Sequence, residues 1–506
     1  MNDSRYIKKA LISVFHKDGL LDIVKSLAGQ GVEFISTGGT RRFLEENGFK
    51  CTAVEDLTGY PSIFGGRVKT LHPKIFGGIL YRRGLEEDRQ EAEKYDIPSI
   101  DLVIVDLYPF EETVKSGASE AEIIEKIDIG GISLIRGAAK NFNDVVIVAS
   151  KAQYRPFAEI LAKQGACTTL EQRRWFAKEA FGVSSAYDSA IFNYFDQPAE
   201  GLRIVADGSK HLRYGENPHQ KGTFFGRFDD MFEQLHGKEI SYNNILDIDA
   251  AVDLINDFDK PAFAVLKHNN ACGIASGKTP VENWREALAC DPMSAFGGVI
   301  ITNTEIDAET AAEMDKIFFE VAIAPGFTPE ALAILEKKKN RILLQAKSFA
   351  LPGFKLRSAL NGYLVEDRDT EGSGTDNFKV VTETAPDDRM KDDMVLADIL
   401  VKHYKSNAIV LVKEGKLLGA GMGQVSRIDS LRHAIARAKA AGRSLEGAVM
   451  ASDAFFPFAD CVEEAYNEGV TGVIHPGGSI RDNDSVNFCN AHGMAMVITG
   501  TRHFRH

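Results

Sequence analysis

Cysteine is scarce in this sequence, and positive charge is outnumbered by negative charge. Its 506 residues include six cysteines, none of them in a CxxC pair, and a chain of this length does not depend on disulfides for its stability. Lys and Arg number 59 against 72 Asp and Glu, so the net charge is −13. Proteins that bind duplex nucleic acid usually carry a basic surplus. Reduced thiols are therefore expected, and nucleic acid is not expected as a partner.

Long apolar runs and zinc-binding signatures are also missing. The first residues, MNDSRYIKKALISVF, contain no apolar run of signal-peptide length. No stretch reaches the roughly 18 apolar residues of a membrane span. Neither HExxH nor HxE with PCxxC occurs, so no metal site of the zinc type is expected. We therefore predict a soluble cytoplasmic protein without a membrane partner.

Two glycine-rich segments resemble nucleotide-binding loops but differ from them in length or context. GIASGKT at 273–279 is one residue shorter than a Walker A loop, and a shorter loop does not wrap the phosphates. GAGMG at 419–423 lies in an expected hairpin, whereas a dinucleotide-binding loop opens a helix. ATP hydrolysis on a P-loop and a dinucleotide site are therefore excluded.

Short apolar runs alternate with helical patterns in the first part of the chain. KKALISVF, VEFIST, DLVIVDLYPF and DVVIVAS read as strands, and residues 19–28 read as an amphipathic helix between the first two. This alternation favours a doubly wound parallel sheet covered on both faces. A helix at 171–195 is expected to close the unit. Composition turns polar near 197–212, so we predict domains at 1–198 and 199–506.

The second domain shows a weak internal repeat. Strands are expected at KPAFAVLKH, GGVIIT and NRILLQ, and the polar stretch 366–379 reads as an exposed linker. In both halves a strand is followed by a helix and then by a similar turn, DPMSAFGG in one and ASDAFFPF in the other. We therefore predict two related α/β subdomains, at about 199–370 and 371–506.

Two loops of the first domain are candidates for a phosphate pocket. GGRVKTLHPKIFGG at 65–78 carries Arg67 and Lys69 between glycine pairs, and STGGT at 36–40 joins a strand to a helix. Glycine allows close approach of a ligand to the backbone, and a helix N-terminus attracts anions. The alternative interpretations are a solvated basic loop and an ordinary strand-to-helix turn.

A carboxylate, a phenol and two lysines could transfer protons near these loops. Asp128 precedes a glycine pair, Lys140 lies farther along the same segment, and Tyr108 ends a core strand. Together with Lys69 these groups suffice for a ring closure with loss of water. The alternative is that Asp128 caps a helix and that Tyr108 is a wetted core residue.

Lys267 and His268 directly follow an apolar strand of the second domain. Burying a cation beside an imidazole is costly unless both have partners, so the pair indicates a site. A neutral histidine acts as a general base, and a neighbouring lysine stabilises a developing oxyanion. The alternative is an edge-strand pair that faces solvent.

The order of these motifs resembles a known family over nearly the whole chain. GGT, GGRVKTLHP, LYPF, IDIGG and AAKN precede RYGENPHQ, LKHNN, SAFGG, KSNAIVL, SDAFFPF and RHFRH, as in the bifunctional AICAR transformylase/IMP cyclohydrolases. AICAR is 5-aminoimidazole-4-carboxamide ribonucleotide. The resemblance implies a methylglyoxal-synthase-like domain that closes formyl-AICAR to IMP. It also implies two cytidine-deaminase-like subdomains, without zinc, that transfer a formyl group from 10-formyltetrahydrofolate to the 5-amino group of AICAR, in the last two steps of purine biosynthesis.

The resemblance also assigns roles to residues that match its motifs. In the first domain the catalytic positions are Lys69, Tyr108, Asp128 and Lys140, and the nucleotide-phosphate contacts are Thr37, Gly38, Gly39, Thr40, Arg67 and Thr70. In the second, His268 matches the base that deprotonates the amine, Lys267 its charged neighbour, and Asn407 the residue that orients the amide and the histidine. Nucleotide contacts match Arg213, Tyr214, Gly297, Glu320, Arg427 and Arg502, and folate-pocket positions match Ile428, Phe455, Asp460 and Ser479.

Assembly and ion binding follow from the resemblance alone. It implies a homodimer with transformylase sites shared between subunits, and a potassium ion near the Asp453 turn. Phe15-His16-Lys17 stands where the family often has Ser-Asp-Lys, and Ala271 replaces a usual proline. Two alternatives are a non-catalytic nucleotide-binding module on the same folds and a lone methylglyoxal-synthase-like lyase, which leaves 300 residues unexplained.

Overall fold

The computed structural model describes residues 4–372 and 374–506. The chain divides into two compact units, one ending at Val205 and the other beginning at Ala206. This division lies inside the polar stretch where the composition changes. Within the described residues, no helix combines the length and the apolar character that crossing a membrane requires.

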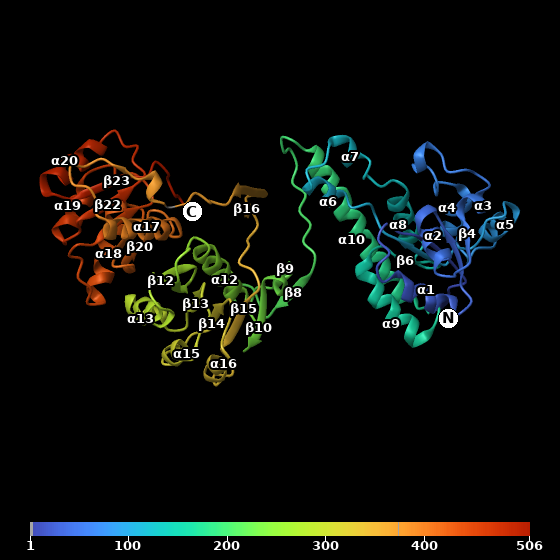
Figure 1. The fold of residues 1–506 in the computed structure, drawn as a ribbon, viewed down its shortest axis with the longest axis horizontal. Coiled ribbons are helices and arrows are strands. Elements are labelled where there is room, and N and C mark those ends of the chain that lie inside the picture. Colours follow the sequence, from blue (N-terminus) through green and yellow to red (C-terminus); the bar gives the residue numbers. More distant parts are fainter. Residues whose placement is uncertain (1–3, 373) are drawn as a thin grey trace. The chain divides into compact units, whose positions relative to one another are not determined.

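The first unit is built on a five-stranded parallel sheet, as the alternating pattern predicts. Its order is β4-β3-β2-β5-β6, and every neighbouring pair is parallel. All residues of the two strands β5 and β6 are buried, because helices lie on both sides of the sheet (Figure 1). The strands are β2 (Lys9–Ser13), β3 (Glu33–Ser36), β4 (Cys51–Ala53), β5 (Leu102–Val105) and β6 (Val146–Val148).

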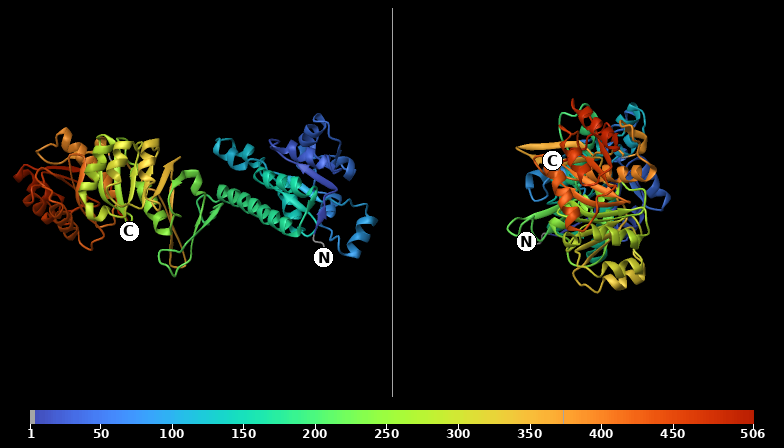
Figure 2. Two further views of the ribbon diagram at one scale, coloured as in Figure 1. Left: turned by 90° about the horizontal axis from the view of Figure 1, so that it is seen from below. Right: turned by 90° about the vertical axis from the view of Figure 1, so that its left-hand side faces the viewer.

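The longest helix of this unit, α10 (Leu170–Phe195), closes it as expected (Figure 2). A capping box starts the helix: Thr169 accepts from the Gln172 backbone, and Gln172 accepts from the Thr169 backbone. The other helices are α1 (Leu20–Ala28), α2 (Gly38–Glu46), α3 (Val54–Thr58), α4 (Pro73–Leu80), α5 (Glu86–Lys94), α6 (Phe110–Lys115), α7 (Glu120–Ile124), α8 (Gly130–Lys140) and α9 (Tyr154–Gln164). A short pair, β1 (Arg5–Tyr6) with β7 (Cys167–Thr168), completes the unit.

The second unit contains a twelve-stranded mixed sheet. Its order is β10-β15-β14-β13-β11-β12-β20-β19-β21-β22-β23-β18, which reads as two six-stranded patterns that meet at β12 and β20. In the first pattern the strands are β10 (Phe232–His236), β11 (Ala262–Lys267), β12 (Asn270–Ser276), β13 (Val299–Thr302), β14 (Val321–Ala324) and β15 (Ile342–Ala346). In the second they are β18 (Lys379–Val380), β19 (Ile409–Lys413), β20 (Lys416–Gly421), β21 (Val449–Ser452), β22 (Gly472–His475) and β23 (Ala495–Ile498).

The two patterns are copies of one arrangement, so the expected internal duplication is confirmed. Each has an antiparallel hairpin, β11–β12 or β19–β20, next to three parallel strands and an antiparallel edge strand. A helix precedes each hairpin, α12 (Tyr242–Ile255) or α17 (Asp388–Lys402), and another follows it, α13 (Pro280–Cys290) or α18 (Arg427–Ala440). Smaller helices are α11 (Phe228–Met231), α14 (Pro292–Ala295), α15 (Ala308–Met314), α16 (Pro329–Leu335), α19 (Asp460–Asn467) and α20 (Asp482–His492).

Most described residues of the predicted linker 366–379 are exposed, as expected, but strands enter the stretch at both ends. Strand β17 (Gly362–Asp367), paired with β16 (Phe354–Ala359), extends into it, and β18 begins at its last residue. Arg368 then pairs with Asp253 at 2.8 Å, and Asp369 binds the His503 ring at 2.6 Å. Of the charged residues in this stretch, Arg368 and Asp369 thus have partners on other elements, while the others are exposed.

Candidate active sites

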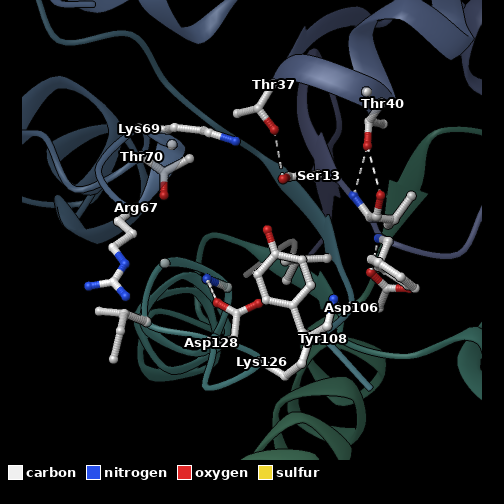
Figure 3. Close-up of a pocket in the computed structure, with 18 of the residues that line it drawn as sticks. Ser13, Thr37, Thr40, Arg67, Lys69, Thr70, Asp106, Tyr108, Lys126 and Asp128 are labelled. Atoms are coloured by element: carbon white, nitrogen blue, oxygen red, sulfur yellow. Dashed lines mark hydrogen bonds between the residues drawn. The ribbon is translucent and has the colours of Figure 1, made fainter. Parts of the chain in front are cut away.

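The larger candidate site is a cavity of about 710 Å³ in the first unit (Figure 3). It opens at the carboxyl ends of β2, β3 and β5, where ligands bind in sheets of this kind. The two predicted loops and the segment before α8 meet there. The cavity is lined by residues from 13–17, 37–40, 65–70, 105–108 and 124–131.

Hydroxyl groups join the loops after β2 and β3 on one wall of this cavity. The Ser13 and Thr37 hydroxyls are 2.9 Å apart. Thr40 accepts from the Val14 amide at 3.0 Å and donates to the Val14 carbonyl at 2.9 Å. Thr40 therefore clamps two loops together. Helix α2 begins beside it without a side-chain cap, which leaves its first N–H groups to an anion.

The Lys69 side chain passes over Gly66 and reaches the N-terminus of α2. Gly66 has φ +96°, and a Cβ there would lie 2.5 Å from the Lys69 Cε and 2.8 Å from its Nζ. A Cβ on Gly38, the first residue of α2, would lie 4.0 Å from the same ammonium. The ammonium is thus placed beside the N-terminus of α2. Arg67, in contrast, forms an ion pair with Glu125.

Asp128 and Tyr108 lie together on the opposite wall (Figure 3). The Asp128 carboxylate accepts from the Gly131 amide at 2.6 Å. Burial raises the pKa of Asp128, although hydrogen bonds from the backbone work against the shift. Burial and then the Asp128 charge raise the pKa of the Tyr108 phenol. Asp128 is therefore a stronger base than a solvated aspartate, and Tyr108 remains a proton donor at neutral pH.

Tyr187 fixes the segment that carries Asp128, and sequence reasoning missed it. Its hydroxyl accepts from the Asp128 amide at 2.9 Å and donates to the Lys126 carbonyl at 2.6 Å. Tyr187 lies on α10, 59 positions from Asp128 along the chain. No local motif indicates such a contact.

Asp106 and Lys126, which were also missed, and Phe15, which was noted only as a departure from the family pattern, line the cavity with Tyr108. The Asp106 carboxylate accepts from the Phe15 amide and from the His16 amide, the latter at 2.9 Å. This clamp sets the Phe15 ring edge-on to Tyr108, with centroids 5.7 Å apart. The Lys126 ammonium lies 5.7 Å from the centroid of each ring. The one indication in the sequence was that Phe15 departs from the family pattern, because a large aromatic side chain at that position is expected to pack against another residue.

Lys140 is not among the residues that line this cavity, and its predicted role in proton transfer stays a prediction. It is the exposed last residue of α8, and the cavity is at the first. Ten helical steps carry it roughly 15 Å away along the axis. The remaining catalytic positions of this domain, Lys69, Tyr108 and Asp128, all line the cavity, as do Thr37, Gly39, Thr40, Arg67 and Thr70.

In the second unit, Lys267 and His268 line a cavity of about 210 Å³ between the two repeats. Lys267 ends β11 and donates from Nζ to the Phe296 carbonyl at 2.7 Å, so its partner is a carbonyl dipole. His268 is exposed and lies in the hairpin turn. The next residue after Phe296 is Gly297, whose amide binds the Phe318 carbonyl. Glu320 lies two residues after Phe318, and its carboxylate accepts from the Asn244 side-chain amide at 3.0 Å.

Asn407 and Arg427 form a second cluster of predicted residues, in the other repeat. Arg427 is 8% exposed and donates to the Asn407 side-chain oxygen at 2.7 Å and to the Phe455 carbonyl at 3.3 Å. Its guanidinium also lies 3.0 Å from the buried Asp453 carboxylate. Burial lowers the pKa of Arg427, against the raising effect of Asp453. The cluster thus fixes both the Asn407 amide and the Phe455 backbone.

The sheet topology places these two clusters at the same end of the central strands. β11, β12, β20 and β19 are successive antiparallel neighbours. The last residue of β11 and the first residue of β19 therefore lie at the same end of the sheet. Three strand spacings separate them by roughly 14 Å. No hydrogen bond or ion pair within 4–372 and 374–506 joins Lys267 or His268 to Asn407.

The other predicted contacts of this unit are dispersed over several loops. Arg213 follows β8 (Ser209–Leu212), which pairs with β9 (Gly222–Phe225), and its guanidinium lies 5.6 Å from the Tyr214 ring centroid. Ile428 is the second residue of α18, Asp460 the first of α19, and Ser479 accepts from the Arg481 amide before α20. Arg502 is exposed near the C-terminus and lies over Phe504.

Comparison with known proteins identifies two family models in this chain. The model described as "AICARFT/IMPCHase bienzyme" matches residues 138–437, and the one described as "MGS-like domain" matches residues 19–133. The second match covers most of the parallel-sheet unit. The first extends from α8 through the first repeat and into α18 of the second.

Curated relatives match over their full length. The Bifunctional purine biosynthesis protein PurH of Bacteroides thetaiotaomicron is 62% identical over 507 residues, which covers 100% of both chains. The PurH protein of Rhodospirillum rubrum is 46% identical over 520 residues, 99% of each chain. That of Persephonella marina is 45% identical over 516 residues, 99% of this chain and 100% of its own.

Proposed function

The chain belongs to the AICARFT/IMPCHase bienzyme family and is a bifunctional purine biosynthesis enzyme, an AICAR formyltransferase and an IMP cyclohydrolase with a folate-type formyl donor. From this premise we propose that each reaction has its own unit. Ring closure takes place in the Tyr108–Asp128 cavity, and formyl transfer at the Lys267–His268 and Asn407–Arg427 clusters. The observation that carries this division is the separation of the two groups of proton-handling residues between two compact units. Assays of the two half-reactions on single-site variants test it.

Ring closure needs a base, an acid and a site for the nucleotide phosphate. The carboxamide nitrogen of formyl-AICAR attacks the formyl carbon and gives up one proton, for which Asp128 is the base. The formyl oxygen leaves as water, taking this proton and the one from the formamide nitrogen. The Tyr108 phenol and the Lys69 ammonium stabilise that oxygen. The uncapped start of α2, with Thr37, Gly38, Gly39 and Thr40, suits the phosphate.

Formyl transfer needs activation of a weakly nucleophilic amine. The 5-amino group of AICAR attacks the formyl carbon of 10-formyltetrahydrofolate, and His268 takes its proton as the C–N bond forms. The bond from the formyl carbon to N10 then breaks, and the proton goes to N10. Lys267 stabilises the tetrahedral oxyanion, and Asn407, held by Arg427 at 2.7 Å, orients the carboxamide.

The two substrates of this reaction are assigned to different loops. Arg213, Tyr214, Gly297, Glu320 and Arg502 hold the nucleotide together with Arg427. The folate lies against Phe455, which is 39% exposed, and against Ile428, Asp460 and Ser479. Ile428 and Asp460 lie at the starts of α18 and α19, and Ser479 precedes α20.

A homodimer with shared transformylase sites accounts for the distance between the two clusters. An exposed hairpin, β16–β17, offers apolar side chains for assembly, including Leu356, Tyr363 and Leu364. If His268 of one subunit works with Asn407 of its partner, mixing His268→Ala chains with Asn407→Ala chains creates one intact site per mixed dimer. After subunit exchange, about one quarter of the wild-type transfer rate is expected. Activity that stays at the level of the separate variants would contradict the shared site.

A potassium ion beside Asp453 is the second assignment taken from the family. Asp453 is 1% exposed, and neither of its carboxylate oxygens accepts a hydrogen bond within the described residues. The Arg427 guanidinium lies 3.0 Å from Oδ1, so Oδ2 is the carboxylate oxygen left for an alkali cation, which would brace the turn before Phe455. Potassium at 100 times its Kd stabilises the folded enzyme by about 2.7 kcal/mol. Thermal unfolding in KCl against tetramethylammonium chloride measures this gain, which Asp453→Asn is expected to remove; equal gains in both proteins would contradict the site.

We place the enzyme in the cytoplasm. All six cysteines lie in the part of the chain that the structure describes, and each is a free thiol. Burial raises the pKa of Cys461 and of Cys489 to about 12, so these thiols stay protonated at neutral pH. A reducing compartment fits this set of thiols.

A further inference from the structure

The turn that carries His268 has a copy in the other repeat. In the β11–β12 hairpin, His268 and Asn269 have φ values of 51° and 65°. In the β19–β20 hairpin, Glu414 and Gly415 have φ values of 55° and 74°. Two consecutive residues with positive φ form the hairpin turn that matches the twist of antiparallel strands. Positive φ is uncommon for residues other than glycine, although histidine and asparagine tolerate it better than most, and hydrogen bonds from the surroundings help to hold the turn.

A carboxylate from the preceding helix binds each of these turns. Asp247 is the sixth residue of α12, and its Oδ1 accepts from the Asn269 amide at 2.6 Å. Asp393 is the sixth residue of α17, and its carboxylate accepts from the Glu414 amide at 2.9 Å and the Gly415 amide at 2.8 Å. The same acceptor therefore occurs at the same place in both repeats.

The lysine before each turn is duplicated as well. Lys267 donates to the Phe296 carbonyl at 2.7 Å, and Lys413 donates to the Glu446 carbonyl at 2.6 Å. Both hairpins are thus held by a lysine on one side and an aspartate on the other. What differs is the residue at the first turn position, His268 in one repeat and Glu414 in the other.

We propose that Asp247 is a positioning residue for formyl transfer, which acts by holding the 268–269 turn so that the His268 imidazole faces the substrate amine. The proposal rests on the proposed role of His268 as the base. Asp247 accepts a hydrogen bond from the residue directly after the imidazole, so its loss frees the backbone that aims the ring. Asp393 performs the same structural task in a turn without a catalytic side chain, which makes it a control within the same molecule.

The test compares three variants of the full-length enzyme in the formyl-transfer assay with AICAR and 10-formyltetrahydrofolate. For Asp247→Ala we expect kcat to fall about 10- to 100-fold, the range that misplacement of a reacting group produces, with the KM for AICAR changed less than about threefold. Asp247→Asn keeps an oxygen that accepts from the Asn269 amide, so most of the kcat should return. Asp393→Ala is expected to lower the unfolding temperature while kcat stays within about threefold of wild type.

The results of these assays either support or overturn the positioning role of Asp247. Wild-type kcat in Asp247→Ala, or an equal loss of kcat in Asp393→Ala, would overturn the positioning role. No recovery in Asp247→Asn would also overturn it. Thermal unfolding of the same samples reports whether the second unit is folded, because ring closure takes place in the other unit. If His268→Ala itself retains transfer, the proposed base is wrong; if His268→Ala is inactive and Asp247→Ala is not, only the positioning role is wrong.

Discussion

Replacing His268 by alanine is expected to lower the rate of formyl transfer by about 10²- to 10⁴-fold, the usual contribution of a general base. The 5-amino group of AICAR is a poor nucleophile because its lone pair is delocalised into the ring and carboxamide. Without the imidazole, its proton has no acceptor as the C–N bond forms. Lys267 cannot replace it, because its Nζ donates to the Phe296 carbonyl. The measurement is tetrahydrofolate release from 10-formyltetrahydrofolate with AICAR.

The control for this variant is another exposed histidine in the same unit. His433 lies on α18 with its side chain exposed, and His433→Ala should keep the wild-type rate. Ring closure of added formyl-AICAR should be unchanged in both variants, because His268 belongs to the other unit. Transfer at the wild-type rate in His268→Ala would remove the imidazole from the mechanism.

Replacing Asp128 by asparagine is expected to lower the rate of ring closure by about 10²- to 10⁴-fold. Asparagine has nearly the same shape and keeps an oxygen for the Gly131 amide, which binds Asp128 at 2.6 Å. It cannot take a proton from the carboxamide nitrogen. Because burial raises the pKa of Asp128, the wild-type rate should also fall with decreasing pH at a higher pH than for a solvated aspartate. IMP formation from formyl-AICAR measures both effects.

Asp56→Asn supplies the matched control for this second variant. Asp56 is exposed on α3 in the same unit, so the same chemical change there should leave ring closure unaffected. Formyl transfer should stay at the wild-type rate in both variants. Retention of ring closure in Asp128→Asn would show that the carboxylate is not the base.

Parts of the fold were predictable because fully buried strands appear in the sequence as unbroken apolar runs. A parallel strand buried on both faces is apolar at every position, as Leu102–Val105 is. Alternation of such runs with helical patterns therefore predicted the parallel sheet. The repeat of the second unit was visible only as one similar turn, because strand order and register depend on pairing between distant segments rather than on local sequence.

The candidate sites were predictable only where loops carry the functional groups themselves. Glycine and basic residues after strands indicated the first cavity, and Lys69, Tyr108 and Asp128 line it. Tyr187 and Asp247 were missed because each binds a backbone group of a segment distant in the chain. Contacts of this kind produce no motif, spacing or composition in the sequence from which they could be predicted.

The predicted role of Lys140 stays a prediction, because the residue is not among those that line the cavity. The AAKN motif lies near Asp128 in sequence, but α8 starts at the cavity and carries its last residue to the other end. Proximity along a helix of this length is not proximity in space.

The division of two reactions between two units is tested most directly by mixing the two single-site variants. Each is incubated with AICAR and excess 10-formyltetrahydrofolate, first alone and then together, and IMP is measured over time. We expect almost no IMP from His268→Ala or from Asp128→Asn alone, and IMP from the mixture, because one supplies ring closure and the other formyl transfer. Wild-type rates of IMP formation by either variant alone, or no IMP from the mixture of folded proteins, would contradict the account.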